Sequence, residues 1–176
     1  ASQNGTVFLV NGGDGLINWA SASNTTGGHQ LLGGVGRSAA DSFDHTNTAT
    51  GTGAGNSRLA TGAILELQGD FSRNIGTGAG AVEFAGNSGF SAFGGDRTVT
   101  LSGGAPLSWG QADFVDDTFL MGSAYSDSTV NFTNDLNFIT LSRVFEVKAG
   151  VNSNIDGRLS GVLSSTGGGL VEAGAG

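Results

Sequence analysis

The amino-acid sequence predicts an all-β fold and, within that class, a parallel β-solenoid. Glycine supplies 33 of the 176 residues, and each glycine in a helix interior costs roughly 1 kcal/mol relative to alanine. Eleven phenylalanines and an apolar content of 38% provide side chains for a core. Short alternations of apolar and polar residues that end at a glycine recur along the chain, a pattern typical of strands separated by tight corners.

Three of these alternations follow one another at a constant interval, over residues 65–69, 82–86 and 99–103. In a solenoid, equal intervals place like residues in stacked rows about 4.8 Å apart. We therefore expect Val82 to lie directly against Val99. An antiparallel meander or sandwich is the alternative, but it needs no constant interval. With roughly 20 residues per coil, the chain would form about eight or nine coils and a rod of about 40 Å.

The predicted coils occupy residues 63–176, and residues 1–62 are predicted to form an irregular N-terminal β cap within the same continuous domain. In that first part, residues 7–10 and 16–19 have the composition of short strands. Residues 27–62 are mostly small and polar, so we expect an exposed loop or an irregular cap there. A solenoid needs such caps because an open end exposes unpaired strand edges and bare core.

The charge and cysteine content exclude several classes of partner. The formal net charge is −8, and the basic residues lie singly along the chain: Arg37, Arg58, Arg73, Arg97, Arg143, Lys148 and Arg158. Nucleic acids and anionic membranes bind clustered Lys and Arg, so we expect neither as a partner. The absence of cysteine excludes disulfides and thiolate metal sites. No apolar run reaches the eighteen or so residues of a membrane span, so no membrane insertion is expected.

One polar segment contains the residue types of a hydrolytic triad. Asp41, Asp44 and His45 lie within a few positions of Ser38 and Ser42. A triad requires a base that is oriented by a buried acid and a positioned nucleophile. Because these residues crowd into one polar stretch, a solvated turn is the better interpretation.

Calcium is the other candidate ligand that the residue types suggest. Asp113, Asp116 and Asp117, with Asp127, could offer oxygen ligands, but calcium needs six to eight oxygens and the EF-hand pattern is absent. The segment around Ile17 begins like the calcium-binding nonapeptide, but Ile17 stands where an aspartate is needed. We interpret these acids as solvated turn residues and predict no metal or cofactor site.

A carboxylate pair would be the basis of an enzymatic alternative. Some parallel β-helices act on polysaccharides through paired carboxylates on the outer face. At the interval of the repeated alternations, Glu66 and Glu83 would stack about 4.8 Å apart and point outward, with Thr100 in the next equivalent position. A solvated polar face explains the two acids more simply, so no catalytic residue is predicted.

Several segments resemble a known family. Residues 88–101, 107–110 and 127–132 are similar to passenger-type bacterial surface proteins with autotransporter-associated β-strand repeats, and residues 159–176 look like the glycine-rich core motif of that repeat. The resemblance covers roughly residues 62–176. It implies a right-handed parallel β-helix, export, display at the cell surface and often a carboxy-terminal membrane barrel. In that family the motif continues into a further apolar strand, so the chain is expected to stop within a repeat.

The leading expectation is a non-catalytic structural or adhesive segment of a secreted or cell-surface repeat protein. Its partner would be a surface ligand, either a glycan or a protein, or a second copy of the chain. The sequence leaves two alternatives open: a subunit that assembles into filaments, and a carbohydrate-active enzyme on a β-helix.

Overall fold

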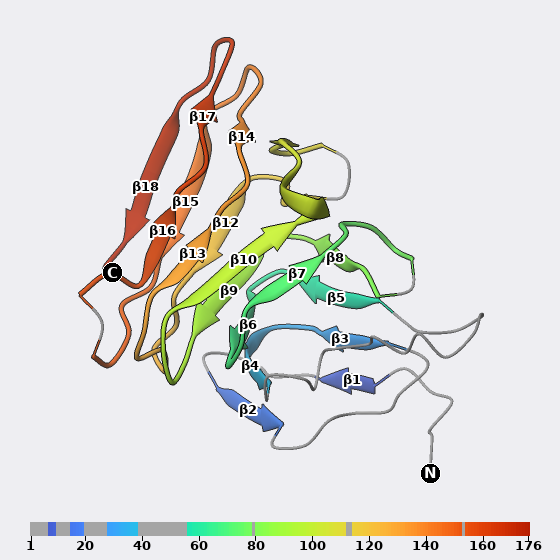
Figure 1. The fold of residues 1–176 in the computed structure, drawn as a ribbon, viewed down its shortest axis with the longest axis vertical. Helices are drawn as coiled ribbons and strands as arrows, with labels where there is room; N and C mark the ends of the chain where they lie inside the picture. The colour runs from blue at the N-terminus through green and yellow to red at the C-terminus, as the bar shows by residue number, and fades with distance from the viewer. Residues whose placement is uncertain are drawn as a thin grey trace.

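The computed structural model describes residues 7–9, 15–19, 28–38, 56–78, 80–111, 114–152 and 154–176. The chain forms a parallel β-solenoid of about five turns, which confirms the predicted fold class. Figure 1 shows strands of successive coils lying side by side, with the first strands at one end of the molecule and the last strands at the other. Among the described residues, no helix is long and apolar enough to cross a membrane.

In the described ranges, four parallel sheets form the walls of the solenoid. The largest contains β2 (Leu16–Trp19), β4 (Gly34–Ser38), β6 (Ala63–Leu67), β9 (Ser88–Ala92), β12 (Thr118–Met121), β15 (Arg143–Val147) and β18 (Leu170–Gly174). A second contains β1 (Val7–Leu9), β3 (His29–Leu31), β5 (Ser57–Ala60) and β8 (Val82–Ala85). A third contains β7 (Phe71–Arg73), β10 (Arg97–Leu101), β13 (Val130–Phe132) and β16 (Gly157–Leu159). The fourth contains β11 (Leu107–Ser108), β14 (Leu136–Asn137) and β17 (Leu163–Ser164). A 3-10 turn, Ser102–Gly104, follows β10.

The predicted stacking of Val82 on Val99 is wrong. Val82 pairs with Ser57 in one sheet, whereas Val99 pairs with Phe71 and Phe132 in another. The shorter interval between Val82 and Val99 joins β8 and β10, which lie on different walls with β9 between them along the chain. The two strands share a pattern because every wall turns alternate side chains inward. Strands that pair directly lie a full coil apart in sequence. These longer coils also reduce the predicted eight or nine coils to about five turns.

Residues 27–62, which the sequence predicted to form a loop or an irregular cap, contribute regular strands. β3 and β5 pair with each other, and β4 pairs with β6. These strands therefore belong to the same sheets as the later coils. Residues 39–55 of this stretch lie outside the described residues.

Aromatic rings from successive coils pack along the axis of the core. Phe119 is fully buried at the centre of this packing. The centroid of its ring lies 5.0–6.4 Å from the centroids of Phe84, Phe90, Trp109, Phe114, Phe132 and Phe145. Most of these contacts are edge-to-face, an arrangement that aromatic pairs prefer. The core therefore couples three or more coils through one side chain.

Candidate functional site

Most of the predicted triad-type residues lie outside the described residues: Asp41, Ser42, Asp44 and His45. Ser38 is the last residue of β4. The other histidine, His29, begins β3 and is buried. The structure therefore does not test the interpretation of this segment as a solvated turn.

The aspartates considered as calcium ligands do not gather in the part of the chain that is described. Asp116 and Asp117 are exposed, and Asp113 lies outside the described residues. The carboxylate of Asp127 accepts hydrogen bonds from the backbone N–H of Gly94, at 2.7 Å, and from the hydroxyl of Ser128. Within the described ranges, no group of three or more His, Asp or Glu residues is placed to hold a metal ion.

Asp127 is one of a set of Asp and Asn side chains that join adjacent coils at their corners. In each case the side-chain Oδ1 accepts a backbone N–H from a neighbouring coil, at 2.7–3.0 Å. The donor and acceptor pairs are Thr98 with Asp70, Thr129 with Asp96, Gly94 with Asp127, Val162 with Asp135, Thr118 with Asn87, and Leu101 with Asn134. These acids and amides are thus inter-coil connectors, a role that sequence reasoning did not foresee.

Asn134 is the most buried of these connectors, with 1% of its surface exposed. Its Oδ1 accepts from Leu101, and its Nδ2 donates to the carbonyl oxygens of Leu101 and Ala105. We expect Asn134→Ala to lower the free energy of unfolding by about 2 kcal/mol, because the backbone groups of Leu101 lose buried partners. Urea denaturation would measure it. Asp135→Ala, which removes an exposed bond to Val162, is the matched control and should cost less than about 1 kcal/mol.

The predicted stacking of Glu66 and Glu83 is also wrong. Glu66 pairs in register with Arg37 and Ser91, and Glu83 pairs with Arg58. Each acid therefore lies opposite a base from the preceding coil, an arrangement that stabilises cross-strand pairs. Glu66 is also fully buried rather than outward in solvent. The carboxylate pair on which the enzymatic alternative depended is not formed.

Glu66 is the centre of a polar group that we call the outer-face cluster: Arg37, Glu66, Ser91 and Ser123. Arg37 Nε donates to Glu66 Oε2 in an ion pair. The hydroxyls of Ser91 and Ser123 donate to Glu66 Oε1, at 3.2 and 2.6 Å. The guanidinium of Arg37 also lies 3.3 Å from the ring centroid of Phe93. The buried carboxylate is thus compensated by one cation and two hydroxyls, as buried charges require.

The cluster fixes a turn over the outer face of the seven-stranded sheet. Arg37 donates to the backbone carbonyl oxygen of Tyr125, and the hydroxyl of Ser126 donates to the backbone carbonyl oxygen of Ser123. Gly122 begins this turn with a φ of +75°, and a Cβ at this position would collide with the carbonyl oxygen of Lys148. Only glycine satisfies both the left-handed conformation and the close approach of the two chains.

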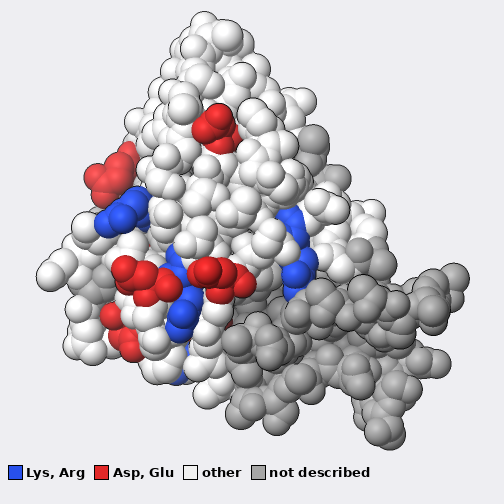
Figure 2. Space-filling view, in the orientation of Figure 1, with Lys and Arg blue, Asp and Glu red and all other residues white. Residues whose placement is uncertain are grey.

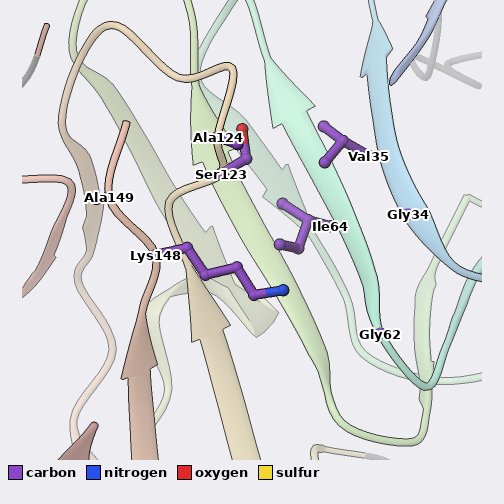
Figure 3. Close-up of a pocket in the computed structure, with 8 residues that line it drawn as sticks. All are labelled: Gly34, Val35, Gly62, Ile64, Ser123, Ala124, Lys148 and Ala149. Carbon is purple, nitrogen blue, oxygen red and sulfur yellow. The ribbon is translucent and has the colours of Figure 1, made fainter. Parts of the chain in front are cut away.

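Beneath this turn lies a cavity of about 280 Å³, which we call the outer-face cavity. Its lining residues are Gly34, Val35, Gly62, Ile64, Ser123, Ala124, Lys148 and Ala149. Figure 3 shows Lys148 extending from the end of β15 across the neighbouring strands, so that its amino group lies beside Ile64. The cavity therefore combines an aliphatic floor with a cation and a hydroxyl-bearing turn, which is the composition of a small-molecule site.

Charge elsewhere on the surface is mixed. Figure 2 shows acidic and basic side chains interspersed on the face turned toward the viewer, with acidic groups on both sides of a basic one. Nucleic-acid-binding proteins gather basic residues into a patch or stripe. The described residues on this face have no such arrangement.

Asp156 is a second buried acid, below the turn at Ser126. Burial raises its pKa above the ordinary value of 3.8, and hydrogen bonds from Gly150 N–H and the Ser126 hydroxyl oppose the shift. The folded chain therefore binds this proton more readily than the unfolded chain, so stability falls as the pH rises through the folded pKa. We expect Asp156→Asn to be more stable than the wild type at neutral pH. The difference in free energy of unfolding between the variant and the wild type should become smaller as the pH is lowered. Urea titrations between pH 7 and pH 4 would measure it.

The fold and the site together define a parallel β-solenoid with a buried polar cluster and a small cavity on the outer face of one wall. Comparison of the chain with protein-family models, curated proteins and solved structures finds no match.

Proposed function

We propose that this chain is a non-catalytic structural segment of a bacterial surface protein, a rigid spacer that displays its outward loops to surface ligands. The observation that supports this proposal most is that the polar side chains connect adjacent coils to one another. The corner aspartates and asparagines bind backbone groups of adjacent coils. On the outer face, Glu66 joins β4, β9 and the turn at Ser123. A segment built to hold its shape over many coils needs such connections at each interface.

The sequence resemblance adds the proposed location. Passenger-type proteins with autotransporter-associated β-strand repeats are exported and displayed at the cell surface, and they have no shared catalytic residues. We extend this to the present chain as a secreted or cell-surface segment. Its proposed partner is a glycan or a protein of the environment.

Two assays test the proposal together. A polysaccharide panel, with the heat-denatured chain as control, should give no reducing-sugar release, and release by the folded chain would overturn the non-catalytic role. Arrays of glycans and matrix proteins should give binding that depends on the outward loops. Binding that survives shortening of every outward loop would argue against display by those loops.

Self-assembly is a second candidate, which the last coil favours. Among the described strands, β16, β17 and β18 each pair on one side. Val162, Leu163 and Val171 on this coil are 41–66% exposed. Open strand edges with apolar side chains are templates for pairing, whether with a following coil or with another chain. Light scattering should show mass rising with concentration, and Val171→Lys should suppress it; a wild type that is monomeric at high concentration would exclude this candidate.

A further inference from the structure

The floor of the outer-face cavity is an apolar patch separate from the main core. Val35 and Ile64 are 4% and 1% exposed and belong to a small cluster with Leu120. They project from the outward side of β4 and β6, while Leu65 and its neighbours in register project into the core. The turn at Ser123 covers part of this patch and leaves the cavity beside it. The patch itself is almost fully buried, so the space that can accept a small apolar group from outside the solenoid is the cavity that it lines.

The cavity also contains a cation without a carboxylate partner among the described residues. Lys148 is the only lysine of the chain, and no described Asp or Glu oxygen lies within 4.0 Å of its Nζ. Glu66 shares Ser123 with the cavity wall, but its oxygens already accept from Arg37, Ser91 and Ser123. A bound anion would give Lys148 a charge-assisted hydrogen bond that no carboxylate in the described part of the chain supplies.

From these two features we propose that the outer-face cavity binds a small aliphatic carboxylate. The carboxylate would lie on Lys148 Nζ, and the hydrocarbon chain would lie against Val35 and Ile64. The volume of about 280 Å³ is close to the lower limit of about 300 Å³ for ligand pockets, which favours a body of about six carbons. A ligand of this size binds weakly, with a dissociation constant on the order of 1 mM.

The single lysine gives the experiment a direct probe. Reductive methylation with ¹³C-formaldehyde keeps the charge of Lys148 and labels only this side chain and the α-amino group. Hexanoate, hexanol and hexylamine are then titrated at constant ionic strength and followed by NMR. We expect hexanoate to shift the Lys148 signal saturably and to leave the α-amino signal in place. Hexanol should bind about tenfold more weakly, because it lacks the charged hydrogen bond.

Substitutions separate charge from packing. Lys148→Met keeps the aliphatic stem over the patch and should weaken hexanoate binding to the level of hexanol, measured from backbone amide shifts near Ile64. Ile64→Phe fills the cavity and should abolish binding of both. Arg158→Met, which removes an exposed cation from β16, is the control and should change nothing.

Three results would overturn this inference. They are equal binding of hexanoate and hexanol, undiminished hexanoate binding by Lys148→Met, and no saturable shift in the high-millimolar range. The proposed structural function does not depend on the outcome, because a spacer segment holds its shape with the cavity filled or empty.

Discussion

Replacing Phe119 by alanine is expected to lower the free energy of unfolding by roughly 3–5 kcal/mol, the cost of removing a large aromatic side chain from a packed core. The ring is fully buried and contacts aromatic rings that come from both sides of β12. Neighbouring rings cannot close the resulting space, because they are held by their own strands in fixed register. Urea denaturation followed by tryptophan fluorescence would measure the loss.

A matched substitution on the last coil provides the control. Leu163 is 41% exposed in β17, so Leu163→Ala leaves no cavity and should cost less than about 1 kcal/mol. Phe119→Leu should lie between the two, since it restores part of the volume. Similar costs for Phe119→Ala and Leu163→Ala would contradict the central position of Phe119 in the core.

The solenoid class was accessible from sequence because it depends on local chemistry. Glycine-rich corners and short alternations such as Val82–Ala85 specify strands that turn one side inward, whichever strand lies next to them. The pairing register was not accessible in the same way. Alternation recurs on every wall of a coil, so Val82 and Val99 match as patterns although they belong to different sheets.

The sequence does contain a signal for the register, in its charges. Arg37 pairs with Glu66, and Arg58 pairs with Glu83, and in both cases the two partners lie one coil apart along the chain. Pairing of opposite charges across strands therefore identifies which strands lie next to each other in a sheet, which apolar alternation alone does not. No comparable pattern in the sequence predicts that Glu66 is buried. Ser123, which covers it, lies more than one coil further along the chain, and the path of the turn that brings it there depends on the packing of three coils.

Breaking the ion pair between Arg37 and Glu66 in the outer-face cluster should also lower the free energy of unfolding by a large amount. Arg37→Met removes the only cation beside Glu66 among the described residues and leaves its carboxylate, with none of its side-chain surface exposed, on two hydroxyls. An uncompensated buried charge costs roughly 3–5 kcal/mol. The equivalent change at Arg58 should cost less than about 1 kcal/mol, because solvent reaches 35% of that side chain and 21% of Glu83.

A double variant distinguishes lost charge compensation from lost packing of Arg37 on Phe93. In the Arg37→Met background, Glu66→Gln removes the buried charge and keeps an oxygen that can accept from Ser91 and Ser123. If the buried charge is the main cost, the double variant should recover most of the loss in urea denaturation, since replacing both members of a buried pair is often close to neutral. If the packing on Phe93 is the main cost, the double variant should be as unstable as Arg37→Met, and the view of Glu66 as the electrostatic centre of the outer-face cluster would be wrong.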